Sequence, residues 1–216
     1  MVVDFFENGL CFYCHLAKNE LLTYKDFHYK TEDSWQKKDE ALQRELDSIL
    51  EKFPDADHHE IIESHGWDLH LNQSKYPEIH RTAIVVATYI FLENHLNGLC
   101  QTFQESIATR LKLRDINGKG VERAFLFLSK VVGFDLSRIS SKSFVNNVNK
   151  LRNRIVHAGG ILPDDQKDGL NRFVERTKGL WGAPGCRVNI ASEFIEDLID
   201  QLISLFDERD RGQVYI

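Results

Sequence analysis

The sequence predicts an all-α protein, in which an antiparallel four-helix bundle follows an N-terminal helical arm. Only 4 prolines and 13 glycines interrupt the 216 residues, so long stretches run without a helix breaker. Apolar residues in these stretches recur at helical rather than alternating spacing. The composition, 42% hydrophobic and 28% charged, is that of an ordinary globular chain. We expect the arm to cover residues 1–73 and the remainder, residues 74–216, to form the bundle.

The arm is expected to contain three helices. The clearest has one apolar stripe on an otherwise charged surface, made of Leu42, Leu46, Ile49, Leu50 and Phe53. Pro54 is expected to end this helix because proline cannot continue the hydrogen-bond ladder. A separate helix is expected over Phe12–Phe27 and a short one over His58–Trp67.

The bundle is expected to begin at Pro77, which suits the first turn of a helix and follows Ser74-Lys75-Tyr76. This helix is expected to reach about Lys112, before a turn cluster at residues 115–120. A second helix is expected over residues 121–132, and Asp135-Leu136-Ser137 offers caps and a turn.

A third helix is expected over Lys142–His157, closed by Gly159-Gly160 as glycines commonly close helices. A short helix is expected from Pro163 to about Thr177, and Gly179–Pro184 is expected to be a loop. The last helix is expected over 191–206, with one apolar face made of Phe194, Ile195, Leu198, Ile199, Leu202 and Leu205. The sole strand signal is a weak one at residues 187–190.

The N-terminus and the longest apolar run both favour a cytoplasmic protein that does not enter a membrane. Residues 1–7 contain two acids and no basic segment, unlike a secretory signal. The apolar run Ala83–Leu92 is interrupted by Thr88 and stops at Glu93, whereas a membrane span needs about 20 apolar residues. We therefore interpret this run as part of a buried helix.

The cysteines and histidines do not form a regular metal-binding pattern, so no metal or cofactor is expected. Cys11-Phe12-Tyr13-Cys14-His15 matches the c-type haem attachment pattern. A zinc site would need His15 or His28 and a further ligand. We favour core-facing cysteines in an arm helix. The histidines near the linker are expected mostly at the surface: His58, His59, His65, His70 and His80.

Charge is distributed unevenly along the chain. The net charge of −6 argues against bulk coating of nucleic acid. The stretch Leu136–Pro163, however, has five basic residues and no acid, whereas Thr31–Ser64 has a net charge of −7. An acid-free basic stretch suits a polyanionic ligand, although the acidic face of a protein partner would match it equally well.

This basic stretch contains the most informative motif, Arg152-Asn153-x-x-x-His157. Asn153 and His157 share a helix face, and the long side chain of Arg152 must curl back to join them. A guanidinium suits phosphate, and an imidazole with a pKa near 6.5 exchanges protons near neutrality. The alternative is a histidine that caps the helix dipole beside a solvated arginine.

The motif resembles the Arg-x4–6-His motif, in its Arg-Asn-x-x-x-His form, of the HEPN superfamily. The resemblance covers roughly residues 76–206 and includes a long helix with Glu93-Asn94-x-Leu96-Asn97, a second helix, the motif near the end of a third, and an amphipathic closing helix. It implies a metal-independent endoribonuclease that works as a homodimer, with two copies of the motif facing one cleft. Many such proteins act as toxins or phage-defence effectors, often beside an antitoxin.

The resemblance also implies residue roles. Arg152 would hold the scissile phosphate, and His157 would transfer protons as the ribose 2′-OH attacks, leaving a 2′,3′-cyclic phosphate. Asn153 would orient these groups or contact the phosphate. Lys150 and Arg154 would add phosphate contacts. Glu93 and Asn97 are candidates for an auxiliary acid and an RNA contact, or else belong to a polar stripe on a core helix. Gly159 stands where toxins under tyrosine-modification control often have tyrosine, which puts that control in doubt.

A second interpretation is a non-catalytic helical module that binds RNA or protein. Family members without nuclease activity exist, and the acidic arm would dock a basic partner or cover the basic site. RNA, a second copy of the chain, and an antitoxin or other protein partner are therefore all candidate partners.

Overall fold

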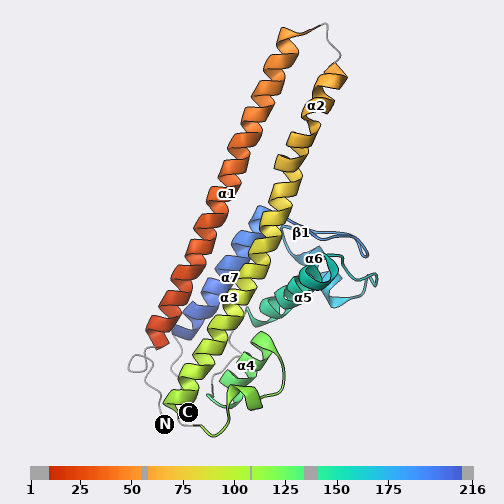
Figure 1. Ribbon diagram of the computed structural model, residues 1–216. Helices are drawn as coiled ribbons and strands as arrows, with labels where there is room; N and C mark the ends of the chain where they lie inside the picture. Colours follow the sequence, from red (N-terminus) through yellow and green to blue (C-terminus); the bar gives the residue numbers. More distant parts are fainter. Residues whose placement is uncertain (1–9, 55–57, 108, 134–140, 211–216) are drawn as a thin grey trace.

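The computed structural model describes residues 10–54, 58–107, 109–133 and 141–210, and it is mostly helical, which confirms the predicted all-α class. Two long helical rods run side by side: α1 (Leu10–Lys52), and a rod made of α2 (His58–His70) and α3 (Tyr76–Ser106) (Figure 1). The closing helix α7 (Ser192–Asp210) packs against both α1 and α3. The smaller elements lie along α3 and α7: α4 (Gly120–Lys130), α5 (Lys142–Ala158) and α6 (Gly169–Arg176), with a short 3₁₀ turn at Leu113–Asp115.

The predicted division of the arm into separate helices before Pro54 was wrong. Residues 10–52 form one helix of 43 residues. Its N-terminal half contributes Cys14, Ala17 and Leu21 to the main core, while its C-terminal half pairs with α2 and extends beyond the other elements (Figure 1). Helix α1 thus belongs partly to the core and partly to the projecting arm.

The predicted helix start at Pro77 is not a break in the chain's helical path. A π-helical turn, Leu71–Lys75, joins α2 to α3, and the Tyr76 amide donates to the carbonyl of Leu71. Proline lacks an N–H and its ring clashes with the carbonyl four residues earlier, so a wider turn before Pro77 lets the helix continue. Helix α3 ends at Ser106, six residues before the predicted end.

The remaining predictions for the bundle agree more closely with the structure. Helices α4, α5 and α7 begin within one residue of their predicted starts, although the short predicted helix at 163–177 is confined to Gly169–Arg176. The weak strand signal corresponds to β2 (Asn189–Ile190), which pairs antiparallel with β1 (Leu180–Trp181) in the segment expected to be a loop. The predicted turn at Asp135–Ser137 lies outside the described residues.

The core lies where α1, α3, α4, α5 and α7 meet. Its largest fully buried side chains include Leu21, Phe103, Phe127, Phe194 and Phe206. By length and composition, the helical stretch His65–Ser106 passes the threshold for a membrane span. Its residues Val85, Leu92 and Leu96 are buried against the other helices, as the interpretation of the apolar run as a buried helix predicts.

Candidate functional site

Helix α5 positions the motif because one of its faces is buried in the core. Val145, Val148 and Leu151 recur every three residues and are at most 1% exposed. The opposite face is therefore free to display polar residues. After Ala158 the chain turns at Gly159, whose φ of 59° lies in the left-handed region, and the Gly160 amide donates to the Arg154 carbonyl at 3.0 Å.

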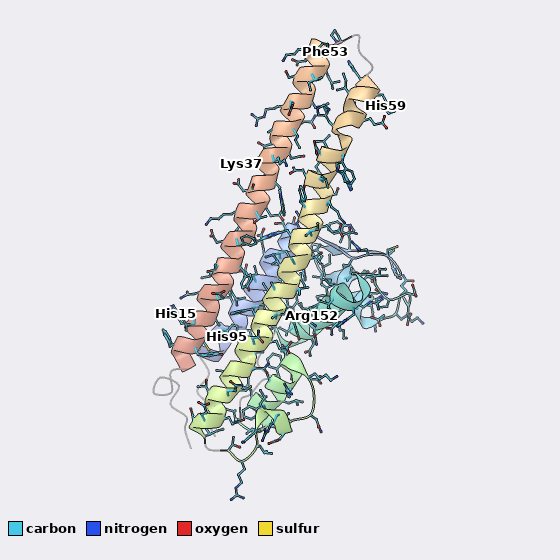
Figure 2. All side chains as sticks on the ribbon, in the orientation of Figure 1. His15, Lys37, Phe53, His59, His95 and Arg152 are labelled. Carbon is cyan, nitrogen blue, oxygen red and sulfur yellow. The ribbon has the colours of Figure 1, made fainter. Side chains whose placement is uncertain are left out.

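The side chains of Arg152 and Asn153 are in contact, as the sequence predicted. The Arg152 guanidinium, however, is directed toward α3. Nη1 of Arg152 donates to Oδ1 of Asn153 at 3.0 Å, and Asn153 donates in turn to Oδ1 of Asn149 at 3.3 Å. The guanidinium lies 5.9 Å from the centre of the Tyr89 ring. Figure 2 labels Arg152, next to the rod that contains α3. Its Nε is buried without a hydrogen-bond partner, and no carboxylate within the described residues forms an ion pair with Arg152. A half-buried cation with a spare donor and no counter-charge suits an anionic ligand.

Tyr89 and Asn149 are site residues that sequence reasoning missed. Burial raises the pKa of Tyr89, as does the negative charge of Glu93, while Arg152 opposes the increase. The Tyr89 hydroxyl therefore stays protonated and remains a hydrogen-bond donor near Arg152. The available signal was spacing: Tyr89 precedes Glu93 by four residues, and Asn149 precedes Asn153 by four.

His157 stands apart from Arg152. Its side chain is exposed, next to exposed Val156, and it makes no hydrogen bond or ion pair with any residue the structure describes. The expected curl of Arg152 toward His157 is absent, because Asn153 and Tyr89 hold the guanidinium at α3. Within one chain the two groups therefore do not share a contact.

The predicted phosphate contacts differ in how freely they can move. Nε of Arg154 donates to the Ile161 carbonyl at 2.7 Å and so anchors the chain after α5. Lys150 is exposed, with its amine against Gly169 at the start of α6. Lys150 is thus the more available of the two cations.

Glu93 and Asn97 point to α4 and its neighbouring loop. The Glu93 carboxylate lies so close to Gly120 that a Cβ there would sit 3.2 Å from it, beside the positive end of α4. Asn97 lines a pocket of about 350 Å³ with Gln101, Gln104 and Arg123. Both Oδ1 of Asn97 and Nε of Arg123 are buried there without a partner.

An apolar groove of about 550 Å³ runs beside the end of α5. Its wall on α3 is a stripe at helical spacing, Ile79, Ala83, Val86 and Ile90. Ile155, Gly159 and Gly160 form the opposite wall, and Arg187 pairs with Glu78 at one end. Ile79 and Ile90 are 56% and 42% exposed, so the described residues of a single chain cover this stripe only in part.

The cysteines and histidines that were considered as metal ligands lie in different surroundings. Cys14 is fully buried in the core, as predicted, while the Cys11 side chain lies outside the described residues. The expectation that the linker histidines lie at the surface was wrong for His80, which is 9% exposed and contacts His28 and Trp35. The continuous rod through Pro77 turns His80 inward toward α1.

The chain was also compared with known proteins: no family model, no curated protein and no solved structure matches it.

Proposed function

We propose that the protein is a HEPN-like, metal-independent endoribonuclease that works as a homodimer in the cytoplasm. The observation that carries this proposal is the Arg152 guanidinium, held by Asn153 on an acid-free helix with a buried, unpartnered Nε. Such a group binds one non-bridging phosphate oxygen and stabilises the charge that develops on it. The four-helix arrangement of the family is part of the same proposal, with α3, α4, α5 and α7 as the four helices.

A second copy would supply what one chain lacks. Arg152 and His157 share no hydrogen bond among the described residues of a protomer, and the exposed stripe Ile79–Ile90 flanks the end of α5. Pairing through this stripe buries apolar surface and places a second α5 beside the first. In that cleft Arg152 holds the phosphate and the exposed His157 takes the proton of the attacking 2′-OH.

The test is incubation of the purified protein with single-stranded RNA in EDTA. We expect products ending in a 2′,3′-cyclic phosphate, no cleavage of DNA, and a loss of at least about 100-fold in rate for Arg152→Ala or His157→Ala. Lys30→Ala is the matched control, because Lys30 is an exposed cation on α1 that pairs with Asp26 at 2.6 Å. Wild-type protein that cuts no faster than the Arg152→Ala/His157→Ala variant would refute the proposal.

The pairing is tested separately by Ile90→Glu. We expect this variant to sediment as a monomer and to lose cleavage, because a carboxylate in a buried apolar contact is costly. Ile62→Glu on α2 is the control, since Ile62 is 47% exposed and lies outside the groove. A wild-type chain that sediments as a monomer at working concentration contradicts the dimer.

The second candidate is a helical module that binds RNA or a protein partner without cleaving it. The observation that favours it is that His157 makes no hydrogen bond with Arg152 among the described residues, whereas Asn153 does. RNA binding that weakens steeply with salt, without cyclic-phosphate products, identifies this module. If the protein neither cleaves nor binds RNA, the function of the module would be to bind an antitoxin or another basic or acidic protein.

A further inference from the structure

Apart from the Arg152–Asn153 group on α5, a second polar cluster lies where α1, α3 and the start of α7 meet. His28 on α1 and His80 on α3 have nearly parallel rings, with Nδ1 of His28 3.0 Å from Nε2 of His80. Glu32, one turn after His28, places Oε1 4.0 Å from that same Nδ1. The three atoms all lie within 4.8 Å of one another, and His28 is fully buried.

We propose that His28, Glu32 and His80 bind one Zn²⁺ ion, which fastens α1 to α3. Two imidazole nitrogens and one carboxylate oxygen form a ligand set that zinc prefers, with water in the fourth position. Zinc–ligand bonds of about 2.0–2.2 Å in a tetrahedron separate neighbouring ligand atoms by about 3.4 Å. The observed 3.0 and 4.0 Å bracket that separation, and the third pair of ligand atoms lies within 4.8 Å.

The groups behind the three ligands already hold them in the required orientation. Nε2 of His28 lies 2.8 Å from Oγ of Ser192, so an N–H on Nε2 leaves the Nδ1 lone pair directed at His80. Arg81 donates from Nε and Nη2 to the two oxygens of Glu32 at 2.8 and 2.6 Å and fixes the carboxylate plane. Hydrogen-bonded histidines and carboxylates of this kind are typical around protein metal ions.

Proton balance allows zinc to enter without charging either ring. In the free protein one proton lies between Nδ1 of His28 and Nε2 of His80. Zinc takes that proton's place, and the proton moves to Nδ1 of His80. Both imidazoles then remain neutral, as zinc ligands must be.

A cavity of about 570 Å³ reaches the edge of the cluster at Glu32. Glu32 and Ser192 line it, together with Asp33 and Asp39. Acidic walls attract a dication, although Asp33 pairs with Lys37 and Asp39 accepts from Gln73. Asn72, 2% exposed, also lines the cavity, and its Oδ1 has no hydrogen-bond partner. That oxygen is an acceptor for a metal-bound water.

The test uses the full chain stripped with EDTA and then titrated with ZnCl₂. We expect one zinc per chain by metal analysis after gel filtration, and a thermal midpoint that rises with zinc. His80→Gln and Glu32→Gln should each bind zinc at least 10-fold more weakly. His15→Gln should bind like the wild type, because His15 is exposed on the same helix and bonds to Asn19.

Two further measurements keep the proposal testable if a ligand variant folds poorly. Ser192→Ala retains all three ligands and should weaken zinc by about 10-fold through loss of the support to His28. Co²⁺ in place of zinc should give a visible absorption band in wild-type protein that is absent from His80→Gln. A wild type that retains no zinc, or equal zinc on His80→Gln and wild type, overturns the proposal. Neither result bears on RNA cleavage, which is assayed in EDTA.

Discussion

Two polar clusters flank α3, and they differ in whether their charges have partners. At the α1–α3 junction, Arg81 is paired through two hydrogen bonds with Glu32, which lies one turn after His28 on α1. At α5, Arg152 has an amide partner but no carboxylate partner in the part of the chain that the structure describes, and its Nε is unsatisfied. Removing one partner of a compensated pair leaves the other charge unpaired and destabilises the fold, whereas a charge without an ion-pair partner is available to a charged ligand.

The largest effect on stability is expected from Arg81→Ala. Arg81 and Glu32 are about one-fifth exposed, and removing the guanidinium leaves the Glu32 carboxylate without its partner beside buried His28. The contact from Arg81 to the Ile190 carbonyl is lost as well. We expect the free energy of unfolding to fall by about 3 kcal/mol in urea titrations of EDTA-treated protein.

Arg152→Ala is the matched comparison for that measurement. With no counter-charge to strand, its unfolding free energy should change by less than about 1 kcal/mol. Equal losses in the two variants would remove the distinction between a structural and a ligand-binding arginine.

The second prediction concerns RNA affinity, which should depend on Arg152 and not on an ion-paired cation of α1. Arg152→Ala should weaken binding of single-stranded RNA by about 1.5–3 kcal/mol and reduce the slope of log K against log salt by about 1. Lys30→Ala should leave both quantities unchanged, because Lys30 lies on α1 beside Asp26. Filter binding at several salt concentrations measures both. An unchanged slope in Arg152→Ala would show that this guanidinium does not contact phosphate.

Sequence reasoning predicted the α5 cluster better than the junction because the motif is local. Arg152 and Asn153 are adjacent, and the Gly159-Gly160 stop was visible in the sequence. The direction of Arg152 was not, because it depends on Tyr89 of α3. The junction joins His28 and His80 across 52 residues. Helical periodicity places each residue on a face of its own helix but does not indicate which faces meet.

Local sequence signals also did not predict that each of the two long rods is continuous. Pro77 predicted a helix start, and the π-helical turn before it allowed the helix to pass through instead. In the same way, the stripe at Leu42–Phe53 and the segment Phe12–Phe27 looked like separate helices, yet no breaker stands between them. Whether such segments join into one helix depends on packing, here of α1 against α7 and α2.

The third prediction compares two glycines, one at the end of α5 and one in the arm. Gly159→Ala should lower the unfolding free energy by about 1 kcal/mol, because alanine is strained at a φ of 59° even though an added Cβ meets nothing closer than 3.7 Å. Gly66→Ala should raise it by up to about 1 kcal/mol, because Gly66 is in the middle of α2 with open space around it. The opposite signs can be read from urea midpoints. A neutral Gly159→Ala would show that the end of α5 tolerates another conformation, and hence that His157 is less fixed than the structure places it.

The smallest expected effect tests a third polar group, the partly buried imidazole of His95 on α3. Its Nε2 donates to the Tyr13 carbonyl at 3.1 Å, and its ring packs against Phe91 and Phe206. Burial lowers the pKa of His95 below the ordinary 6.5, against a smaller opposing effect of the hydrogen bond to Tyr13. Just below pH 6.5 the unfolded chain therefore binds a proton at His95 more readily than the folded chain does.

Unfolding free energy should accordingly fall as the pH drops from 7.5 through 6.5, and the fall should be shallower in His95→Gln. Burial also lowers the pKa of His28 and His80, so the variant keeps part of the slope. Urea titrations of both proteins in EDTA between pH 7.5 and 5 measure the difference, with each protein's value at pH 7.5 as its baseline. Parallel curves would mean that His95 gains its proton equally in both states, and that charging this buried ring, unlike stranding Glu32, does not destabilise the fold.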